Sequence, residues 1–145
     1  MKNTDIHRLL SRYYETWAGI NAAYDRIAAR CGVTSNVLYL LDTLYCAEAP
    51  MTQSEIGARL GLPKQTVASM VSTLERRGYA VREVAKDDHR RRHVLLTVEG
   101  RAYAKPLSET VCAFERMEPD ERLALVETSE KLQKALNTVL DSAQN

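Results

Sequence analysis

The stretch DDHRRRHVLLT concentrates positive charge in a way that the rest of the chain does not. Arg90, Arg91 and Arg92 are consecutive, and two histidines flank them. Guanidinium groups bind phosphate through paired hydrogen bonds, and arginine is the side chain that enters the narrow, negative minor groove of DNA. The preceding Asp87 and Asp88 can hold one arginine in place through charge-assisted hydrogen bonds. The chemistry that this stretch offers is therefore the binding of a polyanion.

A second set of polar side chains follows helical spacing in the stretch PKQTVASMVSTLERRG. One face of this predicted helix is apolar, and the opposite face carries short polar groups with a lysine and a glutamine at its start. A glutamine can bond adenine through two hydrogen bonds, and a lysine can reach guanine or phosphate. The candidate contacts on this face are Lys64, Gln65, Thr66, Ala68, Ser69, Thr73 and Arg76. The alternative is a solvated helix face without a ligand.

Local signals place these residues on a helix-turn-helix. Thr52 and Glu55 have the spacing of a capping box, which predicts a helix that begins directly after Thr52. Gly61 ends that helix, and a second, amphipathic helix runs from about Pro63 to Gly78. Two short helices joined by a glycine turn are typical of a helix-turn-helix.

The hydrophobic period changes after Gly78. The stretches YAVREVA and HVLLTV predict two short strands, and KDDHRRR between them predicts the hairpin loop. The sequence therefore indicates a mainly α protein with a small β-hairpin wing, a winged helix-turn-helix. A charged hairpin can also be a solvated loop that prevents edge pairing of strands. Its position directly after a helix-turn-helix favours nucleic-acid binding.

Long helices are predicted on both sides of this region. An apolar stripe at alternating steps of three and four residues predicts a helix up to Gly32, and Pro119 predicts the start of a last helix. Pro106 is expected to kink or split the helix before it. We expect residues 1–34 and 101–145 to form a helical dimerisation region around a DNA-binding region, residues 35–100, in one intertwined domain.

Composition limits the class of protein. Residues 51–101 carry ten basic and six acidic side chains, an excess of positive charge in the region where a polyanion would bind. No apolar run approaches a membrane span and no signal peptide is recognisable, so a cytoplasmic protein is expected. The three cysteines are expected to be free thiols. Nothing in the sequence suggests a metal, a cofactor or an enzyme's nucleophile and base.

The segment TQSEIGARLGLPKQTVASMVSTLERRGYAVR and the wing stretch DDHRRRHVLLTVEG resemble the MarR family of bacterial transcriptional regulators. The matching positions of the wing signature are Asp88, Arg90, Leu96, Thr97 and Gly100. The resemblance implies that Arg90 reaches the minor groove and that Asp88 orients it. Arg82 matches a frequent family arginine, whereas Pro63 replaces the usual Ser or Asp and removes a side-chain cap.

The resemblance also implies a function. The chain is expected to be a sequence-specific DNA-binding regulator that acts as a homodimer on a pseudo-palindromic operator. A ligand-responsive repressor is the favoured form, with activation left open. The expected wing contacts are Asp88, Arg90, Arg91 and Arg92. A winged helix that binds protein instead of double-stranded DNA is the alternative.

Family members often bind small aromatic or phenolic anions, which predicts an effector site here. The candidate residues are Arg12, Tyr13, Trp17, Tyr39 and Tyr45. Aromatic side chains at helical spacing also form cores, which is the alternative interpretation. A family branch senses oxidants through a cysteine in the first helix, but residues 1–30 contain none. A redox role of Cys46 or Cys112 stays open.

Overall fold

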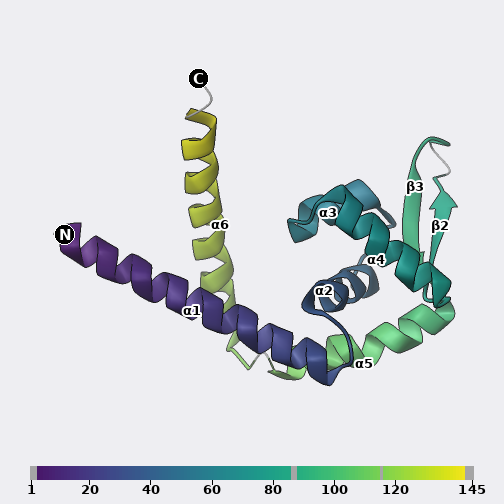
Figure 1. Cartoon of the computed structure of the whole chain (residues 1–145), viewed down its shortest axis with the longest axis horizontal. Coiled ribbons are helices and arrows are strands. Elements are labelled where there is room, and N and C mark those ends of the chain that lie inside the picture. Colours follow the sequence, from purple (N-terminus) through teal and green to yellow (C-terminus); the bar gives the residue numbers. More distant parts are fainter. Residues whose placement is uncertain (1–2, 86–87, 115, 143–145) are drawn as a thin grey trace. The chain divides into compact units, whose positions relative to one another are not determined.

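The computed structural model describes residues 3–85, 88–114 and 116–142 (Figure 1). Along these residues the elements are α1 (Asn3–Arg30), α2 (Ser35–Tyr45), β1 (Met51–Thr52), α3 (Gln53–Leu60), α4 (Lys64–Arg76), β2 (Ala80–Val84), β3 (Arg92–Leu96), α5 (Val98–Phe114) and α6 (Pro119–Ser142). The predicted architecture, mainly α with a winged helix-turn-helix, is confirmed. The helix-turn-helix is α3–α4, and the wing is the β2–β3 hairpin.

Local sequence determines where the central helices begin and end. The Thr52 hydroxyl accepts a hydrogen bond from the Glu55 amide at 3.2 Å, and the Glu55 carboxylate accepts one from the Thr52 amide at 2.6 Å. The predicted capping box of α3 is thus formed. Gly61 ends α3 with a φ of 64°, a left-handed conformation that glycine adopts without strain. Thr34 caps α2 through the amide of Val37.

The wing belongs to a three-stranded antiparallel sheet with the order β1-β3-β2. The β2–β3 hairpin has the predicted strands, with Ala80 opposite Leu96 and Val84 opposite Arg92. Arg92 therefore lies in β3 and not in the hairpin loop, where the sequence placed it. The strand β1 was not predicted, because two residues are too short for a periodic pattern. It joins the start of α3 directly to the wing.

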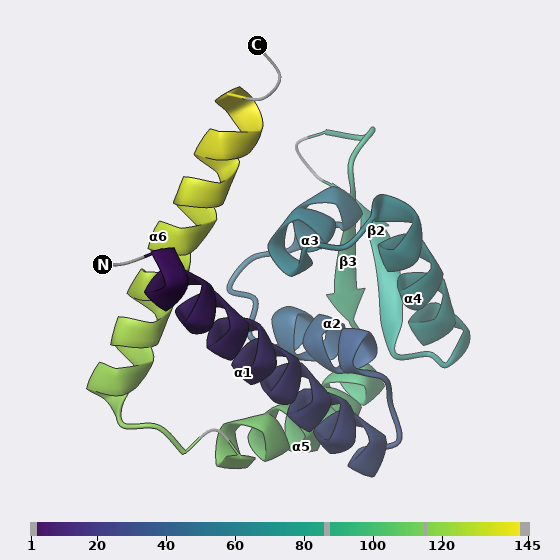
Figure 2. The ribbon, with the colours of Figure 1, turned by 60° about the vertical axis from the view of Figure 1, so that its left-hand side comes forward.

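A single apolar core positions the helix-turn-helix. The helix α2 lies between α1 and the α3–α4 pair (Figure 2), and it supplies the most buried side chains. The largest fully buried side chains are Leu38, Leu40, Leu41, Ile56, Val67, Val71 and Val94. They come from α2, α3, α4 and β3, so burial of apolar surface fixes α4 against the wing.

Of the two outcomes expected at Pro106, a kink or a split of its helix, the structure excludes the split. The helix α5 continues through this proline from Val98 to Phe114. Ala104 and Leu107, on either side of it, are buried in the core, whereas Pro106 is exposed. Proline removes one backbone hydrogen bond, and packing of the buried face keeps the helix intact.

The chain divides into two compact units, Met1–Val111 and Cys112–Asn145. The second unit contains α6, which has no buried residue. Side chains in the N-terminal part of α1 are also exposed, with Tyr13 at 44% and Trp17 at 57%. Among the residues that the structure describes, no helix combines the length and apolarity needed to cross a bilayer.

Candidate nucleic-acid interface

An open groove of about 430 Å³ lies between the helix-turn-helix and the wing. Its lining is Thr52, Gln53, Ser54, Lys64, Arg82, Arg90, Arg91 and Arg92. Five of these side chains are cationic and none is acidic, so the groove attracts a polyanion. The fold thus brings Lys64 at the start of α4 to the same groove as the wing arginines, as the function expected from the sequence requires.

Asp88 shapes the turn that presents Arg90. Its Oδ1 accepts a hydrogen bond from the backbone amide of Arg90 at 2.9 Å, and its carbonyl accepts one from the amide of Arg91 at 2.9 Å. Aspartate commonly stabilises turns in this way. Asp88 therefore orients Arg90 through the backbone and not, as expected, through a guanidinium group. Asp87 lies outside the described residues.

The three wing arginines differ in their partners. The Nη2 of Arg91 donates to Glu55 Oε1 at 2.9 Å, an ion pair between side chains that are 43% and 49% exposed. Within residues 3–85, 88–114 and 116–142, no ion pair involves Arg90 or Arg92, and both are exposed. Arg90 and Arg92 are therefore better placed than Arg91 to bind an external anion.

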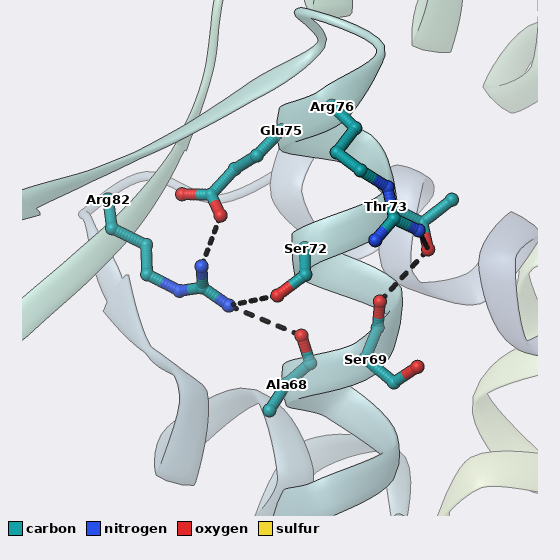
Figure 3. Close-up of polar contacts among 7 residues, drawn as sticks. All are labelled: Ala68, Ser69, Ser72, Thr73, Glu75, Arg76 and Arg82. Atoms are coloured by element: carbon teal, nitrogen blue, oxygen red, sulfur yellow. Dashed lines mark hydrogen bonds and ion pairs between the residues drawn. The ribbon is translucent and has the colours of Figure 1, made fainter.

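The predicted contacts on α4 fall into two groups. Four of them are exposed, namely Lys64, Gln65, Ser69 and Arg76. The other three are half-buried, namely Thr66, Ala68 and Thr73. Toward the end of α4, the Thr73 hydroxyl donates to the Ser69 carbonyl at 3.1 Å and accepts from Arg76 Nη2 at 3.0 Å (Figure 3). The polar groups of Thr73 and Arg76 are thus bonded within the helix, which leaves the first turn as the main contact surface.

The first turn of α4 has no side-chain cap, as the sequence predicted from Pro63. The Pro63 carbonyl accepts hydrogen bonds from the amides of Thr66 and Val67, at 3.0 and 3.2 Å. The backbone amides of the residues before Thr66 lie ahead of the first hydrogen bonds within the helix, as at any helix start. Such amides, together with the positive end of the helix dipole and Lys64, suit a phosphate group.

Four residues that line the groove were absent from the sequence-based contacts, namely Thr52, Gln53, Ser54 and Arg82. Arg82 in β2 and Gln53 at the start of α3 both line it. Figure 3 shows the Arg82 guanidinium directed at α4, where it contacts Ala68, Ser72 and Glu75. The sequence marked Arg82 only through its resemblance to a family pattern. Its partners come from other elements, so no local signal identifies its role.

Glu55 connects the start of α3 to the wing, and its ionisation supports both. Hydrogen bonds from the Thr52 amide and hydroxyl, followed by the charges of Arg91 and His93, hold the pKa of Glu55 below its ordinary value of 4.5. A carboxyl group with a lowered pKa stabilises the folded state above its unfolded pKa, and this stabilisation is lost as pH falls through the folded pKa.

We therefore expect the free energy of unfolding to fall more steeply below pH 4.5 in the wild type than in Glu55→Gln. Glutamine retains the capping box but cannot titrate or pair with Arg91 as an ion. Urea unfolding at steps from pH 7 to pH 3 measures the difference. Parallel pH profiles of the two proteins would show that Glu55 contributes nothing.

The predicted effector residues have separate contacts. Tyr39 packs edge-on against Tyr24 with ring centroids 5.6 Å apart, and Tyr45 lies under the Arg101 guanidinium at 5.2 Å. Arg12, Tyr13 and Trp17 are exposed on α1. Tyr39 and Tyr45 thus take part in intramolecular packing, which is the core interpretation, whereas the α1 residues stay accessible in the single chain.

Comparison of the sequence with known families matches mainly the part of the chain that contains the helix-turn-helix and the wing. The sequence model of the MarR family matches residues 32–91, which contain the helix-turn-helix and most of the wing. NMB1585, a MarR family regulator from Neisseria meningitidis, is 26% identical and has a TM-score of 0.79. That similarity covers 92% of this chain and 97% of NMB1585. Over residues 32–91 the chain is therefore similar to the MarR family. The family that these matches point to consists of transcriptional regulators and not of enzymes.

Curated relatives match a shorter region of the chain. The HTH-type transcriptional regulator YcgE of Bacillus subtilis is 33% identical over 81 residues, and PrsX of Escherichia coli is 30% identical over 78. These matches cover 53% of this chain and about half of each relative's length, 53% and 47%. Overoxidized AbfR, a Staphylococcus epidermidis protein solved bound to DNA, is 27% identical with a TM-score of 0.68. The AbfR similarity covers 94% of this chain and 99% of AbfR.

Proposed function

We propose that this chain is a member of the MarR family, binds double-stranded DNA sequence-specifically and regulates transcription in the cytoplasm. The first turn of α4 enters the major groove, and Arg90 and Arg92 of the wing enter the adjacent minor groove. The five cations that line one groove are the observation that carries this proposal. The AbfR relative bound to DNA supports it. A winged helix that binds protein would not need such a concentration of positive charge.

A homodimer is part of this proposal. The uncovered apolar side chains of α1 include Ile6, Leu9, Leu10, Tyr13, Tyr14, Trp17 and Ile20, and those of α6 include Leu123, Leu125, Val126, Leu132, Leu136, Val139 and Leu140. Monomeric proteins rarely leave so many large apolar side chains of a single helix exposed to water. A second copy that covers residues 1–34 and 101–145 would also present two recognition helices to a pseudo-palindromic site.

For regulation, we propose repression that a small aromatic or phenolic anion relieves. The support is the similarity to the MarR family together with the exposed aromatic side chains of α1. Tyr13, Trp17 and the cation Arg12 lie within two turns of each other on that helix. A ligand that binds there would act where the second copy docks.

DNase footprinting on the DNA that flanks the chain's own coding region tests both proposals. We expect two protected segments with centres roughly 10 base pairs apart, one helical turn, because each recognition helix reads one half-site. A panel of aromatic acids, benzoate and salicylate included, is expected to contain a compound that removes the protection. Absence of any protected segment would contradict the DNA-binding proposal. Protection that none of the acids changes would contradict the proposal that such an anion relieves repression.

A further inference from the structure

Arg82 connects three elements through one guanidinium group. From β2 it reaches the middle of the recognition helix, where its Nη2 donates to the Ala68 carbonyl at 3.2 Å and to the Ser72 hydroxyl at 3.1 Å. Its Nη1 pairs with the Glu75 carboxylate, one turn further along α4 (Figure 3). Arginine's rigid, planar fork of donors makes such a multiple contact specific in geometry.

Gln53 extends this contact to the start of α3. With the side-chain amide oxygen turned toward Arg82, Gln53 accepts hydrogen bonds from Nε at 2.6 Å and from Nη2 at 2.7 Å. Hydrogen bonding assigns this orientation, because it gives both donors an acceptor. Gln53 and Arg82 line the groove between Lys64 and the wing. The same side chain therefore ties the wing to both helices of the helix-turn-helix.

The charge of Arg82 is already compensated. The side chains of Arg82 and Glu75 are only 22% and 28% exposed, much less than those of the Arg91–Glu55 pair in the wing. Nε, Nη1 and Nη2 of Arg82 all donate to acceptors of the protein itself. A phosphate contact would require Arg82 to give up an ion pair in a partly desolvated position, which is unfavourable.

We propose that Arg82 is a positioning residue that sets the recognition helix relative to the wing, and that it does not contact DNA phosphate. The inference rests on the proposed DNA binding. Sequence readout requires α4 and the wing to reach their grooves together, so a helix that moves against the wing loses discrimination between sequences. Non-specific attraction to phosphate does not depend on this alignment.

Two substitutions separate positioning from phosphate contact. Arg82→Lys keeps the positive charge but loses the fork of donors. Glu75→Gln leaves Arg82 in place but removes the charge that compensates it. The probes are a duplex that the wild-type protein selects from a random library and an unselected duplex of equal length. Fluorescence anisotropy gives the Kd for each duplex over a range of salt concentrations.

We expect the ratio of the affinity for the selected duplex to the affinity for the unselected duplex to fall roughly tenfold or more in Arg82→Lys. Its binding to the unselected duplex and the salt dependence of that binding should stay close to those of the wild type. Glu75→Gln should also discriminate less well. An unchanged ratio in Arg82→Lys would show that Arg82 does not position α4. Tighter and more selective binding by Glu75→Gln would indicate a phosphate contact, and either result would overturn the inference.

Thermal melting shows whether these variants are folded. If Arg82→Lys is not, Ser72→Ala and Gln53→Ala take its place, since each removes one acceptor and leaves Arg82 and its charge intact. Each should reduce the affinity ratio, and an unchanged ratio in both would overturn the inference. Failure of the DNA-binding proposal has a different result, because the wild type would then select no duplex.

Discussion

Arg90→Ala is expected to weaken DNA binding by roughly ten- to a hundredfold for each wing that contacts DNA, the usual range for an arginine contact. The Arg90 side chain is exposed, and the turn around it is held by Asp88 through the backbone amide. Alanine keeps that amide, so the fold should not change. Because a dimer carries two wings, the slope of log Kd against log salt should also fall by about two.

Arg26→Ala provides the matched control for this experiment. Arg26 is an exposed arginine of α1 and does not line the groove. Both variants lose one positive charge per chain, so a general charge effect would weaken them equally. The helical circular dichroism signal of both variants should match the wild type. A loss of that signal in Arg90→Ala would assign Arg90 a structural role.

Gly100→Ala is expected to destabilise the fold by about 3 kcal/mol or more, at the upper end of overpacking effects. A Cβ atom at Gly100 would lie 1.8 Å from the Tyr79 carbonyl oxygen, a backbone atom that cannot rotate away. The Thr97 hydroxyl also holds the start of α5 close to Gly78 and Tyr79. It donates to the Gly78 carbonyl at 2.6 Å and accepts from the Gly100 amide at 2.9 Å. The start of α5 would have to move away from β2.

Thermal unfolding measures this effect, with a decrease in Tm of roughly 10 °C expected for a chain of this size. Gly19→Ala is the control, because a Cβ atom there has no atom within 4 Å and alanine favours a helix interior. Its Tm should stay the same or rise slightly. A Tm of Gly100→Ala within about 2 °C of the wild type would mean that the close contact between Gly100 and Tyr79 relaxes without loss of packing.

Much of the fold was predictable because its signals are local. The capping box of Thr52 and Glu55, the turn at Gly61 and the alternation in the wing strands depend on neighbours in sequence. The continuity of α5 through Pro106 was not predictable, because it depends on burial of Ala104 and Leu107 in a core built from distant elements. The two residues of β1 form a strand only because β3 lies beside them.

The candidate site shows the same division between local and distant contacts. Residue type and spacing identified the wing arginines and Lys64 in the first turn of α4, which do line one groove. Spacing did not reveal that Arg91 pairs with Glu55 or that Arg82 bonds to α4, because those partners are brought together by the tertiary fold. For the same reason, residue type alone assigned equal roles to three wing arginines whose partners differ.

The salt dependence of DNA binding by the wild-type protein tests the central claim most directly. Of the five cations in the groove, Arg82 and Arg91 are paired with Glu75 and Glu55, which leaves Lys64, Arg90 and Arg92 for phosphate. Three cations in each copy of a dimer predict a slope of log affinity against log salt of about −5. A slope near zero, or no binding to any duplex at low salt, would contradict the assignment of this groove to DNA.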